Sequence, residues 1–252
     1  MTGTSIDILQ ITDLHIHDDP EGRSGGRDTL ATLTGVVRAI QTSDRDPAFV
    51  LATGDLPDSA KPAAYRRLKP LLAELPAPVY VIPGNHDLVP EMRAHLVGGP
   101  IRHVDAVTAG AWTIVLLDST VPYEVHGHLD EDRLEALERE IGGAQTPNVL
   151  VVMHHQPAPI GSPLDDCGLM NAQDLYGVLD RHDTVRGLLW GHIHHEHDSE
   201  RRGVRHLGTP STCVQFSTEP GAGIVYTDQP PAYRRLRLHD DGRIETEVVW
   251  VA

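Results

Sequence analysis

The chain has 252 residues, a formal net charge of -15 at pH 7 and only two cysteines, Cys167 and Cys213. This length can bury a substantial core, so we expect a single domain over residues 1–252 that needs no disulfide. The acidic balance excludes a general nucleic-acid surface, and the lack of a long apolar run or a basic, apolar leader excludes a membrane span and predicts a cytoplasmic protein.

Apolar residues spaced three or four apart predict helices, and short apolar runs that end in turn residues predict strands. The expected helices cover residues 28–43, 60–75, 90–97, 130–141 and 171–179. The expected strands cover residues 6–12, 49–55, 79–82, 111–117, 149–153, 185–190, 204–207, 223–226, 233–238 and 243–251. Helices and strands alternate first and strands come last. This order predicts an α/β protein in which two sheets pack together between outer helices, a four-layer α/β/β/α sandwich.

Polar residues directly follow five of the apolar runs. They are Asp13 and His15, Asp55, Asn85 and His86, the pair His154 and His155, and His192 and His194. In open α/β folds, the carboxyl ends of parallel strands lie at one edge of the sheet, where ligands bind. The sequence therefore predicts one polar site at such an edge, organised around Asp55.

These candidates offer oxygen and nitrogen donors only, a mixture that suits manganese, iron, zinc or cobalt. Seven protein ligands exceed what one catalytic ion needs, because such an ion keeps a position open. We therefore expect two divalent ions that share Asp55. The first would also bind Asp13, His15 and His194. The second would also bind Asn85, His192 and one histidine of the pair 154–155.

Any one of these motifs is weak evidence for a metal site, since Asp and Asn are ordinary turn and cap residues. Together and in this order, they resemble the motifs of calcineurin-like metallophosphoesterases over about residues 7–210. The stretches that most resemble the bacterial class III cyclic-nucleotide phosphodiesterases are residues 8–13, 51–55, 83–87, 116–119, 191–194 and 210–216.

This resemblance implies the four-layer sandwich, a dinuclear metal centre and hydrolysis of cyclic AMP to AMP by a metal-activated hydroxide. Iron or manganese are the first expectation for the two ions, with zinc and cobalt as alternatives. Alternation along a strand lets only one of His154 and His155 face the ions. The resemblance selects His154 as that ligand. His155 is then expected to support the site or to pack in the core.

His86 is the candidate catalytic residue, because it adjoins a ligand without being needed as one. Its imidazole would protonate the leaving oxygen or stabilise the charge on it. We expect Asn85, His86 and His194 to contact a small phosphodiester substrate, and we leave His126 in the loop 121–128 open as a further contact. His195 and His197 are expected in a solvated loop. Surface or core positions are expected for His17, His95, His103, His128, His182, His206 and His239.

Two alternatives compete with the cyclic-nucleotide phosphodiesterase. One is a phosphodiesterase of broader specificity, such as a glycerophosphodiester hydrolase. The other is a non-catalytic scaffold of the same fold, which complete retention of the ligand positions disfavours. The sequence leaves open whether the chain forms a homodimer and whether cyclic AMP or cyclic GMP is preferred.

Overall fold

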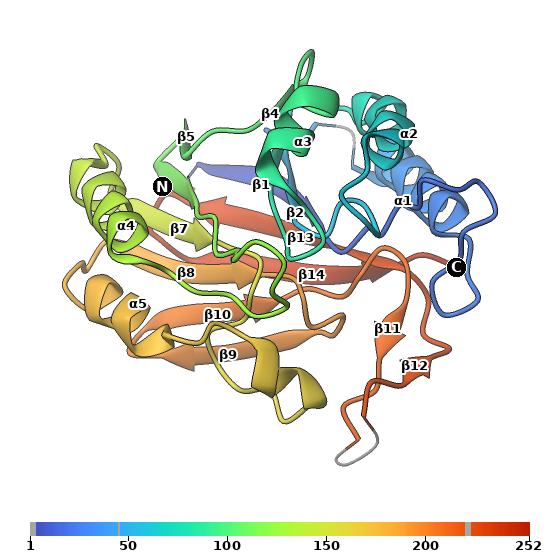
Figure 1. Cartoon of the computed structure of the whole chain (residues 1–252). Coiled ribbons are helices and arrows are strands. Elements are labelled where there is room, and N and C mark those ends of the chain that lie inside the picture. The colour runs from blue at the N-terminus through green and yellow to red at the C-terminus, as the bar shows by residue number, and fades with distance from the viewer. Residues whose placement is uncertain (1–3, 45, 220–222) are drawn as a thin grey trace.

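The computed structural model describes residues 4–44, 46–219 and 223–252 and has two six-stranded sheets at its centre (Figure 1). The first sheet has the strand order β14 (Ile244–Trp250), β13 (Ala232–His239), β1 (Ser5–Ile11), β2 (Val50–Thr53), β3 (Val79–Ile82) and β4 (Ile101–Arg102). The second has the order β5 (Ala106–Ala109), β6 (Trp112–Leu116), β7 (Asn148–Val152), β8 (Val185–Trp190), β10 (Val204–Gly208) and β9 (His197–Arg201). A separate pair consists of β11 (Gln215–Phe216) and β12 (Tyr226–Thr227).

Helices cover the outer face of each sheet (Figure 1). On the first sheet lie α1 (Thr29–Ser43), α2 (Pro62–Ala73) and α3 (Val89–His95). On the second lie α4 (Glu131–Gly143) and α5 (Ala172–Leu179), and the short 3-10 helix η1 (Pro163–Cys167) packs in the same apolar cluster. A third apolar cluster fills the space between the sheets, with Trp112, Leu150 and Leu236 among its members. The predicted α/β/β/α sandwich is therefore confirmed.

The sequence pattern of α1 shows how local rules produce this arrangement. Its buried Leu33, Val36, Val37 and Ile40 recur at helical spacing and face the first sheet. Asp28 caps the helix because its side chain accepts a hydrogen bond from the backbone nitrogen of Ala31 at 3.1 Å.

Strand direction places the functional residues. β1, β2 and β3 run parallel to one another in the first sheet, and β6, β7 and β8 do so in the second. The two sheets are joined near the ends of these strands, where the side chain of Gln10 donates to the carbonyl oxygen of Trp190 at 3.1 Å. The carboxyl ends of strands from both sheets therefore lie at one common edge (Figure 1).

Several short elements differ from the prediction. Of the strand expected over 223–226, only Tyr226 is in a strand, because Ile224 and Val225 are exposed and not buried as an apolar run suggests. The solvated loop expected for His195 and His197 is wrong for His197, which begins β9, and both side chains are partly buried. β4, β5, η1 and β11 were not predicted either, because they are short or lack a continuous apolar run. No helix among the described residues is long and apolar enough to span a membrane.

Candidate metal centre and active site

The predicted site residues come together at the common edge of the two sheets. Backbone hydrogen bonds fix the turns that carry them, since the nitrogens of Leu14 and His15 both donate to the carbonyl oxygen of Asp55, at 2.8 and 3.0 Å. The turn after β8 is tied to the turn after β7 by a bond from the nitrogen of Gly191 to the carbonyl oxygen of His154 at 3.1 Å.

The backbone at these turns has an unusual conformation. Five candidate ligands have positive φ angles between 44° and 66°, namely Asp13, His15, Asp55, His192 and His194. Residues other than glycine rarely adopt this region, and each such residue costs on the order of 1–3 kcal/mol. Packing from both sheets holds the chain in this conformation, and the strain is concentrated at the candidate ligands.

One group of donor atoms consists of Asp13, His15 and His194. The Nε2 atom of His194 lies 3.3 Å from Oδ1 of Asp13 and 3.2 Å from Nε2 of His15. All three residues offer donor atoms within 4.8 Å of one another. Because metal–ligand bonds to such donors are about 2.0–2.2 Å long, atoms this close can bind one ion.

A second group lies on the other side of Asp55. Oδ1 of Asp55 is 3.3 Å from Nε2 of His154, which in turn is 3.2 Å from Oδ1 of Asn85. Oδ2 of Asp55 faces the first group, 3.6 Å from Nε2 of His15. The carboxylate of Asp55 therefore lies between the two groups, with one oxygen toward each.

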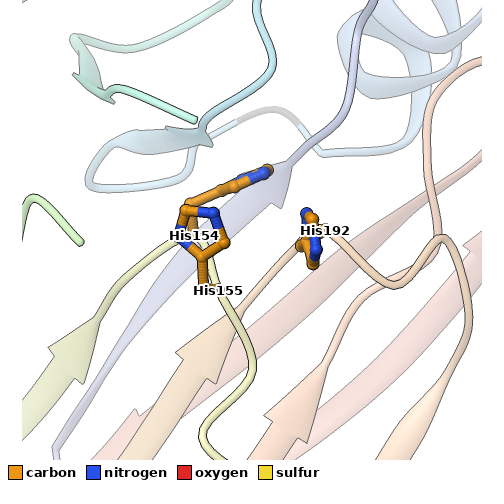
Figure 2. Close-up of side chains that lie close together, drawn as sticks. All are labelled: His154, His155 and His192. Carbon is orange, nitrogen blue, oxygen red and sulfur yellow. The ribbon is translucent and has the colours of Figure 1, made fainter. Parts of the chain in front are cut away.

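His192 approaches the second group from β8, as Figure 2 shows. Its ring centroid lies 5.1 Å from that of His154 and 4.8 Å from that of His155. His154, His155 and His192 offer donor atoms within 4.8 Å of one another. The structure therefore brings all seven predicted ligands to one place, together with His155.

Backbone carbonyl groups select which ring nitrogen of each histidine is free. Nδ1 of His154 lies 2.8 Å from the oxygen of Thr53, and Nδ1 of His194 lies 2.6 Å from that of Val214. A carbonyl oxygen only accepts, so these nitrogens carry a proton and the Nε2 atoms face the carboxylates, where a bound cation would take the place of a second proton. In His192 the order is reversed, because its Nε2 lies 3.1 Å from the oxygen of Cys167. Such outer contacts are typical of metal-binding histidines.

The electrostatics also suit a cation. Burial lowers the pKa of His15 to about 3 and that of His192 to about 4, so both rings are neutral ligands near pH 7. Burial also disfavours protonation of His154, but Asp55 and Asp13 outweigh it and raise its pKa to about 9. The carboxylates that attract a proton to this nitrogen would attract a metal cation in the same way. Oxygen and nitrogen donors, two buried carboxylates and oriented imidazoles therefore fit divalent ions.

His86 lies at the side of the two groups. Its Nδ1 atom is 2.6 Å from the carbonyl oxygen of Asp58, its Nε2 atom is 3.9 Å from Oδ2 of Asp55, and its ring is partly exposed. Burial lowers the pKa of His86, but the charge of Asp55 and the bond to Asp58 outweigh this and raise it above the usual value. The ring can therefore hold a proton on Nε2 beside the candidate ligands.

His155 has different hydrogen-bond partners from His154. The alternation along a strand that was expected to separate the two histidines does not apply. β7 ends at Val152, so both histidines lie in the turn beyond it. Nδ1 of His155 lies 2.8 Å from the hydroxyl of Ser119, and Nε2 lies 3.1 Å from the carbonyl oxygen of Val125. Both nitrogens have protein partners, which agrees with a supporting role and ties the loop 121–128 to the site.

Glycines give the ligands space. A Cβ atom on Gly54 would lie 2.4 Å from Nδ1 of His154, and one on Gly84 would lie 2.3 Å from Oδ1 of Asp55. At Gly191, it would lie 2.7 Å from Oδ2 of Asp13. Gly54, Gly84 and Gly191 therefore cannot carry a side chain, because the ligand side chains approach their Cα atoms too closely.

Sequence reasoning missed several contributors. The carbonyl groups of Thr53, Cys167 and Val214 orient ligands, but a backbone atom leaves no signal in the residue type. Phe216 stacks on the ring of His194 with centroids 4.0 Å apart and an interplanar angle of 13°. The stretch 210–216 carried the family resemblance and was the available signal for this residue. His126 belongs to neither donor group and lies 3.9 Å from the carboxylate of Glu124.

The fold and this site define a phosphoesterase with a His- and Asp-rich centre, and the chain belongs to the calcineurin-like phosphoesterase family. Residues 6–196 match the family described as Calcineurin-like phosphoesterase. Among solved structures, a dimetal phosphatase from Danio rerio has the same fold, with a TM-score of 0.64, 15% identity, and coverage of 98% of this chain and 99% of that one.

Curated relatives cover almost the whole chain. The 3',5'-cyclic adenosine monophosphate phosphodiesterase CpdA of Pseudomonas aeruginosa is 40% identical over 249 residues, covering 98% of this chain and 90% of the relative. CpdA of Escherichia coli K12 is 40% identical over 96% of this chain and 88% of the relative. A 3',5'-cyclic-nucleotide phosphodiesterase of Nostoc is 33% identical over 96% of this chain and 91% of the relative.

Proposed function

We propose that this protein is a metal-dependent phosphodiesterase that hydrolyses 3',5'-cyclic AMP to AMP. The observation that carries the proposal is the position of Asp55, whose two carboxylate oxygens face two separate groups of oriented donor atoms. The 40% identity to cyclic AMP phosphodiesterases over nearly the whole chain supports the choice of substrate.

In this proposal each residue has a defined task. Asp13, His15, Asp55 and His194 hold one divalent cation, and Asp55, Asn85, His154 and His192 hold the other. Iron or manganese are our first choice for the cations. Bound divalent cations supply Lewis acidity, which lowers the pKa of water and offsets charge on a phosphoryl group.

The protein's own residues orient and complete the reaction. Asn85, His86 and His194 border the space in which the phosphodiester would lie. A water molecule loses one proton to solvent, its oxygen attacks phosphorus, and the bond to one ester oxygen breaks. His86 gives its Nε2 proton to that leaving oxygen and regains a proton from solvent. The bond to Asp58 keeps the proton of Nδ1 in place, so Nε2 is the atom that exchanges protons with the substrate.

A substrate panel tests the proposal. The protein reconstituted with Mn²⁺ or Fe²⁺ is incubated with cyclic AMP, cyclic GMP, bis(4-nitrophenyl) phosphate and glycerophosphocholine, and the product is quantified by chromatography. Formation of AMP with the highest kcat/KM of the panel supports the proposal. Turnover of the other diesters without cyclic AMP would replace the substrate but keep the chemistry. No turnover of any diester by protein that holds two metal ions would favour the scaffold.

A further inference from the structure

Three aromatic rings form a row from the candidate metal centre to the surface, and the first ring belongs to the candidate ligand His194. Phe216 stacks on the ring of His194 with centroids 4.0 Å apart, and Tyr226 lies on Phe216 with centroids 5.6 Å apart and an interplanar angle of 45°. Phe216 is partly buried, whereas 51% of Tyr226 is exposed. We refer to His194, Phe216 and Tyr226 as the aromatic row. It connects a candidate metal ligand to an exposed tyrosine.

The outer end of the aromatic row is held firmly. Phe216 and Tyr226 are register partners in the pair β11–β12, which stands apart from both six-stranded sheets (Figure 1). The side chain of Gln215 fixes the base of this pair, since it donates to the carbonyl oxygen of Ser211 at 2.8 Å. The ring of Tyr226 also lies against Gly25, where an added Cβ atom would be 2.9 Å from its Cγ.

The two residues that precede Tyr226 are apolar and exposed. Ile224 is 59% exposed and Val225 is 44% exposed, and both precede Tyr226 directly in the chain. Apolar surface that is left exposed beside a site is typical of a surface that binds a ligand. A cyclic nucleotide has a charged phosphodiester at one end and a flat, weakly polar base at the other, with the sugar between them. The candidate metal centre suits the phosphodiester, and the exposed end of the aromatic row suits the base.

We propose that the nucleobase of the substrate stacks on the exposed ring of Tyr226 while the phosphodiester lies at the metal centre. This inference rests on the proposed function, because it identifies what binds the other end of the same substrate. Stacking uses the π-face that every base has, so Tyr226 strengthens the binding of cyclic AMP and cyclic GMP equally. Tyr226 is then a binding residue, and Phe216 positions both His194 and Tyr226.

Tyr226→Ala and Tyr226→Phe test the inference by steady-state kinetics on cyclic AMP. We expect Tyr226→Ala to raise KM about 10-fold while kcat stays within about twofold, and Tyr226→Phe to behave like the wild type. Metal content, measured by inductively coupled plasma mass spectrometry, should be the same in all three proteins. Tyr123→Ala is the matched control, because Tyr123 is 87% exposed and lies in the loop 121–128 on the His155 side of the site.

Inhibition by product fragments separates this inference from the proposed function. Wild-type protein should bind AMP more tightly than ribose 5-phosphate, which lacks the base, and Tyr226→Ala should remove that difference. The inference is overturned if Tyr226→Ala leaves KM and the AMP preference unchanged, if it lowers kcat and metal content only, or if Tyr123→Ala has the effect. If the wild type does not hydrolyse cyclic AMP, the proposed function fails, and the two fragments still report whether a base stacks on Tyr226.

Discussion

The Nδ1 atom of His86 lies 2.6 Å from the carbonyl oxygen of Asp58, while its Nε2 atom lies 3.9 Å from the carboxylate of Asp55. The first contact fixes the ring, and the second places its free nitrogen beside the carboxylate, where His15, Asp55 and His86 offer donor atoms within 4.8 Å of one another. Because both donor groups are complete without His86, we propose that it transfers a proton and does not hold a metal.

We accordingly predict that His86→Ala lowers kcat by about 10²- to 10⁴-fold, the usual contribution of a general acid. Metal content should stay near the wild-type value. Stopped assays of AMP formation and elemental analysis of the same preparation measure the two quantities. His95→Ala, which removes a histidine from the surface of α3, is the control and should change neither. Loss of metal from His86→Ala would show that His86 is a ligand and not an acid.

Asn85→Ala should abolish activity by weakening one metal position. Oδ1 of Asn85 lies 3.2 Å from Nε2 of His154, so its removal takes an oxygen donor from the second group. Because loss of an outer contact alone costs 10- to 100-fold in metal affinity, loss of a ligand should cost about 100-fold or more.

The measurement is recovery of activity after chelation. Dialysis against a chelator should inactivate both proteins, and added Mn²⁺ should restore the wild type at concentrations that leave Asn85→Ala inactive. Equal recovery of the two proteins at the same Mn²⁺ concentration would exclude Asn85 as a ligand.

Gly54→Ala and Gly203→Ala separate backbone strain from crowding at the site. Both glycines have positive φ, +94° at Gly54 and +81° at Gly203, but a Cβ atom on Gly203 would meet nothing within 4 Å. Gly203→Ala should therefore lower the free energy of unfolding by about 1 kcal/mol and leave metal affinity unchanged. Gly54→Ala should be more destabilising and should also weaken metal binding, since its Cβ atom would lie 2.4 Å from Nδ1 of His154. Calorimetry and metal titration measure both effects, and equal metal affinity of the two variants would contradict the prediction.

His206 should make the protein less stable in acid. Its ring is 3% exposed and stacks on Tyr176 with centroids 5.8 Å apart, and burial, together with the nearby His197 and Arg201, lowers its pKa to about 4. Between pH 6.5 and about 4 the unfolded chain binds a proton at this residue and the folded protein does not. The free energy of unfolding therefore falls as the pH decreases through this range, by about 3 kcal/mol.

His206→Phe keeps an aromatic ring at this position and removes the titration. Chemical denaturation of both proteins at pH 8 and at pH 4.5 gives the difference in stability at each pH. We expect the variant to gain relative to the wild type as the pH falls, and an equal difference at both pH values would contradict the assignment. Comparing the two proteins cancels the other groups that titrate in this range.

The sequence was most informative where chemistry and strand direction coincide. Asp55 and His192 could be placed at one edge because each directly follows a buried apolar run, and parallel strands end on the same side. β3 and β8 have the predicted bounds, since their apolar runs are fully bounded by turn residues. α2 begins two residues later and ends two residues earlier than predicted, at Pro62 and Ala73. Proline favours the first position of a helix, which explains the later start.

The features that could not be predicted depend on contacts between distant segments. The partners of His155, Ser119 and the carbonyl group of Val125, follow only from the folded loop 121–128. The stacking of Phe216 on His194 likewise depends on where β11 returns to the site. β9 was missed because its residues are mostly exposed and charged, so no apolar pattern marks it, and it forms by pairing with β10.

The donor set draws on both sheets, with Asp13 and Asp55 following strands of the first and His154 and His192 following strands of the second. Cations held by this set would fasten the two halves of the sandwich to each other, and the centre can form only after both halves have folded. Metal uptake would then report the completion of folding. A free metal concentration 100 times the dissociation constant would make unfolding about 2.7 kcal/mol less favourable for each independent ion.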